Sequence, residues 1–200
     1  MDKKILIATR NVKKRKEMEE LLQDTGWQVL TLQVYPDAPD VIEDGATFLE
    51  NAAKKAISAS LYTGVLTLAD DSGLEVDALN GRPGVHSARY SAGDLSTDED
   101  NLQKVLSEME GVAEQDRTAR FVCAAVLAQG DQVLFSTRQT VEGEIIHDKR
   151  GTGGFGYDPI FFYPPFQQTL AEIPSEKKHT VSHRGKALRE VLEFLKKNRS

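Results

Sequence analysis

Two adjacent aspartates near the middle of the chain are the residues best suited to catalysis. Asp70 and Asp71 follow an apolar run, residues 66–69, which predicts a buried strand. The residues Asp-Asp-Ser-Gly then break this run, so we expect both carboxylates at the end of the strand. Neighbouring negative charges disfavour ionisation unless a cation lies near them, and Mg²⁺ prefers such hard oxygen ligands. An ordinary aspartate-rich turn fits the same residues equally well.

The turn after the first predicted strand, residues 4–8, is a candidate anion site. A modest helical pattern of apolar residues begins at Val12, and the free N–H groups and the dipole of a helix start both attract anions. Thr9 and Asn11 offer side-chain hydrogen bonds, and Lys14 offers positive charge. In the alternative interpretation, Asn11 is a simple N-cap and the lysines form a solvated face.

A further polar group accompanies the helix predicted over residues 47–62. Thr47 and Glu50 have the spacing of a capping box, and apolar side chains then recur every four residues along the segment. Glu43 lies in the loop before this helix, where a carboxylate could face a metal. Lys55 projects from the helix and could face the same site. Both could equally be ordinary surface charges.

The glycine-rich segment, residues 151–156, formally matches the dinucleotide-binding pattern G-x-G-x-x-G. That pattern needs a strand before it and a helix after it. Asp158-Pro159 and an aromatic run follow here instead, so we exclude dinucleotide binding. Glycines beside Phe155 let a flat ligand approach the backbone while the ring stacks on it. Core packing is the alternative for Phe155 and Tyr157.

Three donors that could recognise oxygen atoms on a base lie nearer the end of the chain. They are Lys178, His183 and Arg184, the last two at the start of the final predicted helix. The alternative for His183 and Arg184 is a helix start that carries a surface pair. The P-loop pattern G-x-x-x-x-G-K-[ST] does not occur. His179 and His183 are four residues apart, but we expect no zinc site among the 4 histidines.

The composition indicates a single domain, residues 1–200, of 40% apolar and 28% charged residues, which is long enough for a sizeable core. A formal net charge of −6 argues against a nucleic-acid binder. Two local basic clusters nevertheless suit a small polyanion. They comprise Arg10, Lys13, Lys14, Arg15 and Lys16, and then Lys177, Lys178, Arg184, Lys186 and Arg189.

The chain shows neither a membrane-spanning apolar run nor a signal peptide. Cys123, the single cysteine, lies in an apolar run, so we expect an inert buried thiol. These features favour a cytoplasmic protein with no membrane partner. The remaining pattern predicts strands over 27–32, 119–128 and 132–141, with the last two as a hairpin, and a helix that begins at Thr97.

Six motifs occur in one order along the chain. They are Thr9-x-Asn11-x-x-Lys14, Phe48-x-Glu50-Asn51-Ala52, Ala69-Asp70-Asp71-Ser72-Gly73-Leu74, Pro83-Gly84-x-x-Ser87-Ala88-Arg89-Tyr90, Gly151-Thr152-Gly153-Gly154-Phe155-Gly156-Tyr157-Asp158-Pro159 and Ser182-His183-Arg184-Gly185-Lys186-Ala187. In this order they closely resemble the inosine/xanthosine triphosphate pyrophosphatases, which remove deaminated purine nucleoside triphosphates. The resemblance extends from Lys4 to the final helix.

The resemblance implies a mixed α/β fold with an elongated central sheet flanked by helices, two lobes and a substrate cleft between them. It implies a homodimer. It also implies Mg²⁺-dependent hydrolysis of the α–β phosphoanhydride of ITP, dITP and XTP, which yields nucleoside monophosphate and pyrophosphate.

The resemblance further implies roles for individual residues. Glu43 and Asp71 would hold Mg²⁺, and Asp71 would also orient or deprotonate the attacking water, with support from Asp70. Lys55 would add positive charge near the phosphates, and Ser72 would touch the substrate. The residues implied to hold the triphosphate are Thr9, Arg10, Asn11, Val12, Lys13 and Lys14. Those implied to form the nucleoside pocket are Phe155, Gly156, Tyr157, Asp158, Lys178, His183 and Arg184.

Two departures from the family pattern affect the expected substrate affinity. Arg10 and Lys13 stand where the family often has a small residue and glycine, and Ala92 interrupts a usual Ser-Gly pair. Two other functions stay open on the sequence. One is a pyrophosphatase for modified pyrimidine triphosphates, and the other is a sensor that binds purine nucleotides without cleaving them.

Overall fold

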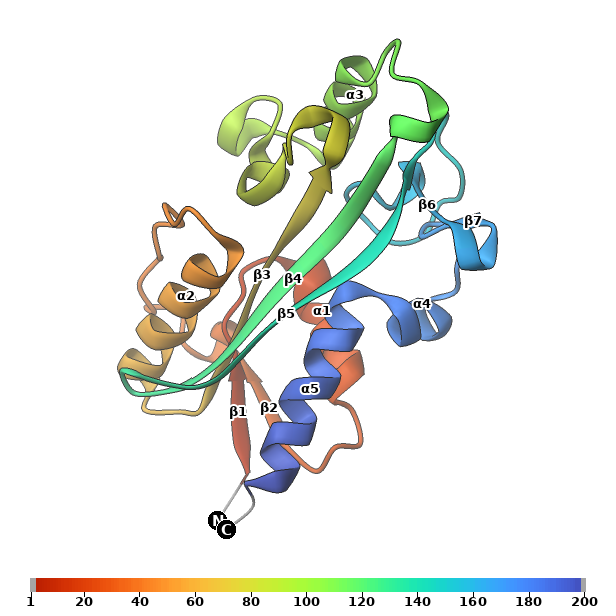
Figure 1. The fold of residues 1–200 in the computed structure, drawn as a ribbon. Coiled ribbons are helices and arrows are strands. Elements are labelled where there is room, and N and C mark those ends of the chain that lie inside the picture. Colours follow the sequence, from red (N-terminus) through yellow and green to blue (C-terminus); the bar gives the residue numbers. More distant parts are fainter. Residues whose placement is uncertain (1–2, 199–200) are drawn as a thin grey trace. The chain divides into compact units, whose positions relative to one another are not determined.

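The computed structural model describes residues 3–198 and contains a mixed sheet of seven strands within that range (Figure 1). The sheet order is β2-β1-β3-β4-β5-β6-β7. The strands are β1 (Lys4–Ile7), β2 (Gln28–Thr31), β3 (Thr67–Val76), β4 (Thr118–Gln129), β5 (Gln132–Ile145), β6 (Phe161–Tyr163) and β7 (Gln168–Thr169). The helices are α1 (Val12–Leu22), α2 (Phe48–Thr63), α3 (Asp98–Glu108), α4 (Ser175–Val181) and α5 (His183–Lys197).

The pairing of the strands confirms the expected mixed α/β class. β1 pairs in parallel with both β2 and β3, whereas β6 pairs antiparallel with β5 and β7. Of the described residues, those up to Asp71, Cys123–Gln139 and those from Arg184 form one compact unit, and Ser72–Val122 with Thr140–His183 form a second. Each unit has its own hydrophobic core.

The first unit buries the parallel strands between helices. α1 and α5 cover one face of these strands and α2 covers the other (Figure 1). Met18 of α1 and Leu188 of α5 join Ile5, Ile7 and Leu68 in one apolar cluster. α2 presents small buried residues at four-residue intervals, Ala52 and Ala56 among them. Such small side chains let the helix backbone approach the strands closely.

The second unit contains residues 72–76 of β3, 118–122 of β4 and 140–145 of β5. Its core joins side chains of β3, β4 and β5 to α3, which contributes Leu102 and Val105. Phe121 and Phe161 pack within this core with ring centroids 4.7 Å apart. Thr97 caps α3 through a reciprocal capping box with Asp100. The predicted helix at Thr97 is therefore confirmed.

The predicted strand end at Asp70 is wrong. β3 continues without interruption from Thr67 to Val76, so Asp70 and Asp71 lie inside a strand and not in a turn. Isolated Asp-Asp-Ser-Gly favours a turn because its side chains compete for local hydrogen bonds. Here β3 lies between β1 and β4 in the sheet, and pairing on both sides satisfies its backbone better than a turn would.

Other predicted elements agree with the structure. α2 begins after Thr47, whose side chain and that of Glu50 form the expected capping box, and β4 and β5 are consecutive strands on either side of Gly130. α4 was not predicted, since its sequence is polar and short. Within residues 3–198, none of the helices combines the length and the apolar character that crossing a membrane requires.

The capping box of α3 leads to a stability prediction. Thr97→Ala removes the acceptor for the Asp100 N–H group, so we expect the free energy of unfolding to fall by about 1 kcal/mol. Thr97→Ser keeps the hydroxyl and serves as the matched control. Urea titrations of the three proteins measure the effect, and equal stability of Thr97→Ala and wild type would contradict it.

Candidate active site

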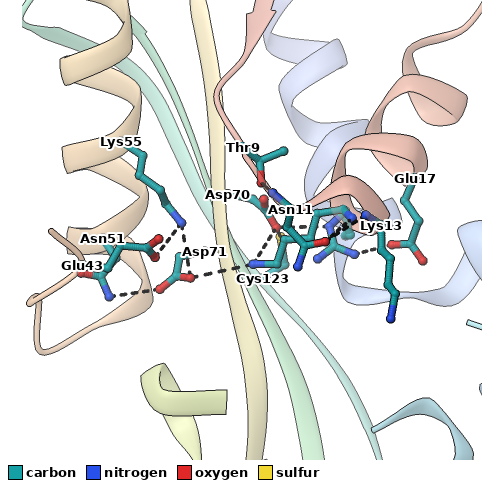
Figure 2. A network of polar contacts seen from close by, with 12 residues as sticks. Thr9, Asn11, Lys13, Glu17, Glu43, Asn51, Lys55, Asp70, Asp71 and Cys123 are labelled. Carbon is teal, nitrogen blue, oxygen red and sulfur yellow. Dashed lines mark hydrogen bonds and ion pairs between the residues drawn. The ribbon is translucent and has the colours of Figure 1, made fainter. Parts of the chain in front are cut away.

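The continuity of β3 sends Asp70 and Asp71 to opposite faces of the sheet, because consecutive side chains of a strand alternate. Asp70 lies on the same face as Leu68, which packs with α1 and α5. Asp71 points toward α2 (Figure 2). The two carboxylates therefore have different neighbours, although they are adjacent in sequence.

Asp70 is fully buried and surrounded by cations. Arg184 Nε donates to its Oδ2 atom at 3.2 Å, and Lys14 Nζ lies 3.9 Å from the same oxygen. Cys123 Sγ also faces Oδ2 at 3.9 Å. Burial alone would raise the pKa of Asp70, but Lys14, Arg184 and Lys55 together hold that pKa well below its ordinary value. Asp70 is therefore an ionised partner for these cations at neutral pH.

Asp71 has a less cationic environment. Asn51 Nδ2 donates to its Oδ2 atom at 3.1 Å, while Oδ1 lies 3.5 Å from Lys55 Nζ and 3.9 Å from Lys14 Nζ. Burial raises the pKa of Asp71, Lys55 and Lys14 oppose that rise, and the negative charge of Glu43 adds to it. Of the two aspartates, Asp71 is thus the better proton acceptor.

Lys55 connects Asp71 to the loop before α2. Its Nζ atom lies 2.8 Å from Glu43 Oε2, so one ammonium group bridges two carboxylates. Burial would lower the pKa of Lys55, but Asp71, Asp70 and Glu43 outweigh it and raise that pKa. The family resemblance implied that Glu43 and Lys55 lie at this site. In the structure, Lys55 forms ion pairs with both Glu43 and Asp71.

The chemistry of these donors fits Mg²⁺. Glu43 and Asp71 direct hard carboxylate oxygens at one shared cation, the Lys55 ammonium. Residues 3–198 contain no cluster of three or more histidine, cysteine or acidic side chains suited to a metal. Mg²⁺ needs no such cluster, because one or two carboxylates with water and substrate phosphates complete its shell.

The turn before α1 differs in part from the predicted anion site. Asn11 is the N-cap, and its Oδ1 atom accepts from the N–H groups of Lys13 and Lys14. Two of the helix-start donors are therefore already engaged. Thr9 Oγ1 accepts from the Asn11 N–H group. Lys14 does not lie on a solvated face, since its ammonium contacts both aspartates.

The neighbours of the turn are more exposed. Val12 is 63% exposed, and the Lys13 side chain also faces solvent. Arg10 forms an ion pair with Asp40 at 2.5 Å and donates to the Ala38 carbonyl at 2.7 Å. Arg10 therefore binds the loop that precedes Glu43. It would have to leave Asp40 and the Ala38 carbonyl to bind a ligand.

The second unit holds most of the residues predicted for the nucleoside. Asp158 and Lys178 form a buried ion pair at 2.8 Å, and the same Asp158 oxygen accepts from the Phe155 N–H group at 2.8 Å. Lys178 Nζ lies 5.3 Å from the centre of the Phe155 ring. Gly154 has a φ of +68°, and a Cβ atom there would lie 2.0 Å from Asp158 Oδ2. Only glycine allows this turn.

The aromatic residues beside this turn divide between core and surface. Tyr157 is buried and donates through its hydroxyl to the Ser87 carbonyl at 2.7 Å, so its side chain has the structural role considered as the alternative. Phe155 is only half-buried. The Gly156 N–H group donates to Asp98 at 3.0 Å. Ser72, the first residue of this unit, is half-buried.

His183 and Arg184 are not the surface pair that the alternative interpretation expected. His183 is buried and stacks on Phe121 with ring centroids 4.9 Å apart and planes 9° apart. Arg184 is buried in the first unit, where Asp70 and Glu17 accept its hydrogen bonds. Arg184 thus contacts Asp70, whereas Lys178 contacts Asp158.

This arrangement of side chains accompanies a match to a known family. Residues 5–194 match the model of the Ham1 family. The chain belongs to the Ham1 family. The match confirms the resemblance inferred from the six motifs, all of which lie within it.

Relatives and solved structures agree with this assignment. The chain is 49% identical to a protein of Desulforamulus reducens named dITP/XTP pyrophosphatase, over 96% of this chain and 95% of that protein. A relative of the same name from Geobacter sulfurreducens is 49% identical over 92% of each chain. The fold is similar to a HAM1 protein from Coxiella burnetii, with a TM-score of 0.88, 41% identity, and coverage of 97% of this chain and 98% of that one.

Sequence motifs of the Ham1 family did not assign a role to three residues at these sites. Asn51 contacts Asp71, and Glu17 contacts Arg184. Asp98 contacts the Gly156 backbone. Helical spacing offered a signal for two of them, since Asn51 lies one turn before Lys55 and Glu17 lies three residues after Lys14. The contact of Asp98 links residues 58 positions apart and left no such signal.

The buried position of Asp70 leads to a second stability prediction. We expect Asp70→Asn to lower the free energy of unfolding by roughly 3 kcal/mol at pH 7, because it leaves Arg184 and Lys14 buried without a full counter-charge. The folded pKa of Asp70 is depressed, so its contribution is present above the unfolded pKa of about 3.9 and is lost as pH falls below it.

Denaturant titrations between pH 3 and pH 8 measure this difference. The control is Asp40→Asn, which removes an exposed ion pair with Arg10 and should change stability by less than about 1 kcal/mol. A destabilisation by Asp70→Asn that persists unchanged at pH 3 would contradict the assigned cause.

Proposed function

We propose that the protein hydrolyses non-standard purine nucleoside triphosphates, ITP, dITP and XTP, to nucleoside monophosphate and pyrophosphate with Mg²⁺. The observation that carries the proposal is the Asp71 carboxylate held among Asn51, Lys55 and Lys14. Relatives about half identical over nearly their whole length and named dITP/XTP pyrophosphatase support it. Asp71 and Glu43 supply the acidic groups such a reaction needs, and Lys14 and Lys55 supply the basic ones.

Phosphoryl transfer depends on charge neutralisation and on a water placed in line with the leaving group. Lys14 and Lys55 supply two ammonium groups beside the aspartates. The hydroxyl of Thr9 and the amide of Asn11 add uncharged hydrogen-bond donors at the turn before α1. These groups would bind the triphosphate, and the exposed Lys13 adds charge at the same helix start.

Asp71 would orient the attacking water and accept its proton. Its raised pKa suits a base, whereas the fully enclosed Asp70 would keep Lys14 and Arg184 in place. Asp71 and Glu43 would hold Mg²⁺, which when bound acts as a Lewis acid toward phosphate oxygens. Lys55, already shared by these carboxylates, would then be directed toward the phosphates.

The Phe155 turn would bind the base. The half-buried ring offers a stacking face, and such stacking is worth roughly 1–3 kcal/mol per base. Lys178 is a donor-only group held by Asp158. Hypoxanthine and xanthine present an oxygen at position 6, whereas adenine presents an amino group. A donor such as Lys178 therefore favours the 6-oxo purines over adenine, which would set a donor against a donor. Guanine also carries a 6-oxygen, so rejection of GTP would depend on the group at position 2.

The homodimer and the cytoplasmic location stay predictions. A single catalytic domain of residues 1–200 is also part of the proposal, with each of the two compact units contributing part of the functional residues. Sedimentation of the purified chain measures its oligomeric state.

Substrate turnover tests the proposed reaction. We expect fast, Mg²⁺-dependent release of pyrophosphate from ITP, dITP and XTP, and far slower release from ATP, GTP and dUTP. A preference for modified pyrimidine triphosphates would replace the proposed substrate class. Binding of ITP by folded protein without release of pyrophosphate would instead indicate a sensor.

The role of Asp71 has its own test. Asp71→Asn keeps the size of the side chain but removes the base, so we expect kcat to fall by roughly 10²–10⁴-fold with the fold intact. Asp44→Asn is the matched control, since Asp44 is an exposed carboxylate of the same loop as Glu43. Near-normal turnover by folded Asp71→Asn would remove Asp71 from this role.

A further inference from the structure

A buried amide links the two carboxylates proposed to hold the metal. Asn51 lies on the first turn of α2 and is only 1% exposed. Burying a polar side chain is unfavourable unless its donors and acceptors find partners. Asn51 contacts Asp71 (Figure 2) and also the backbone of Gly45, so its two partners belong to different parts of the chain.

The two hydrogen bonds of Asn51 fix its orientation. Nδ2 donates to Asp71 Oδ2 at 3.1 Å, and Oδ1 accepts from the Gly45 N–H group at 2.8 Å. A flipped amide would set its oxygen against the carboxylate and its NH₂ group against the Gly45 N–H group. An amide carries its donor and its acceptor on separate atoms, so Asn51 meets these two partners in one orientation only.

The backbone of the loop is shaped to reach this amide. A Cβ atom on Gly45 would lie 2.6 Å from Asn51 Oδ1 and 2.9 Å from Glu50 Cβ. Only glycine permits such a close approach without displacement of the loop. Glu43 stands two residues earlier, so the bond between Asn51 and Gly45 seats the segment that carries the Glu43 carboxylate.

The same amide determines which oxygen of Asp71 faces the cations. Oδ2 is held by the neutral Asn51 donor, and Oδ1 is left directed at Lys55 and Lys14. Glu43 meets the same Lys55 ammonium from the loop side. Both carboxylates thus converge on the Lys55 ammonium, and Asn51 joins Asp71 to the backbone of the Glu43 loop through hydrogen bonds.

We infer that Asn51 is a positioning residue, whose amide fixes the orientation of Asp71 and seats the loop that carries Glu43. This role rests on the proposed function, since Asp71 is there the catalytic carboxylate. A purely structural residue would affect stability alone. A positioning residue affects turnover in protein that is folded.

The test replaces Asn51 by leucine, which is similar in size and makes neither hydrogen bond. We expect kcat for ITP to fall about 10–100-fold, as is typical when the partner of a catalytic or ligand carboxylate is lost. KM should change less than about threefold, because the triphosphate contacts at Lys14 are untouched. Asn51→Ala is measured in parallel, in case the leucine variant does not fold.

Ser60→Ala is the matched control on the same helix. Ser60 is also fully buried, and its hydroxyl likewise bonds at both ends, to the Val65 carbonyl and the Gly130 N–H group. We expect Ser60→Ala to lower stability while kcat stays within about twofold of wild type. The positioning role would be overturned if a folded Asn51 variant, leucine or alanine, had the same kcat as Ser60→Ala.

A readout without substrate examines the loop. Hydrogen exchange of the Gly45 amide, followed by NMR, should accelerate in Asn51→Leu and stay unchanged in Ser60→Ala. Unchanged Gly45 exchange in the leucine variant would overturn the seating of the loop. Wild-type protein that releases no pyrophosphate would overturn the proposed function itself, and that result is distinct from normal turnover in the Asn51 variants.

Discussion

The first unit depends on the burial of two consecutive carboxylates inside a paired strand. An ionised carboxylate inside a protein is very unfavourable unless cations and hydrogen-bond donors surround it. β3 runs through both aspartates without a break, and both side chains are buried. The helices on both faces must therefore supply the compensating groups. Lys14 comes from α1, Arg184 from α5, and Asn51 and Lys55 from α2.

Alternation along β3 then gives the adjacent aspartates different properties. Asp70 faces a guanidinium and an ammonium, which keep it ionised, while Asp71 meets a neutral amide and shares Lys55 with Glu43. One carboxylate fixes the positions of the cations, and the other retains the capacity to accept a proton. Had the residues formed a turn, both side chains would have met similar solvent and could not have differed in this way.

The sequence allowed much of this to be predicted, and physical reasons explain the remainder. Local signals were sufficient for α2, since the capping box at Thr47 and the four-residue periodicity are properties of neighbouring residues. The path of β3 was mispredicted because turn propensity is local, whereas the strand is imposed by partners far away in the sequence. The burial of Arg184 was equally invisible, because its partner Asp70 lies 114 positions away. Motif order identified the family without any of these contacts.

The second unit also contains a buried carboxylate that is paired with a cation. Asp158 is buried like Asp70, and it holds both the Lys178 ammonium and the Phe155 backbone. Its carboxylate pairs with the buried Lys178 ammonium, and its bond to the Phe155 N–H group fixes the turn from which the ring projects. In both units, then, a buried carboxylate holds a cation in place, Lys14 and Arg184 at Asp70 and Lys178 at Asp158. This explains how a chain with a net charge of −6 can present concentrated positive charge where a nucleotide would bind.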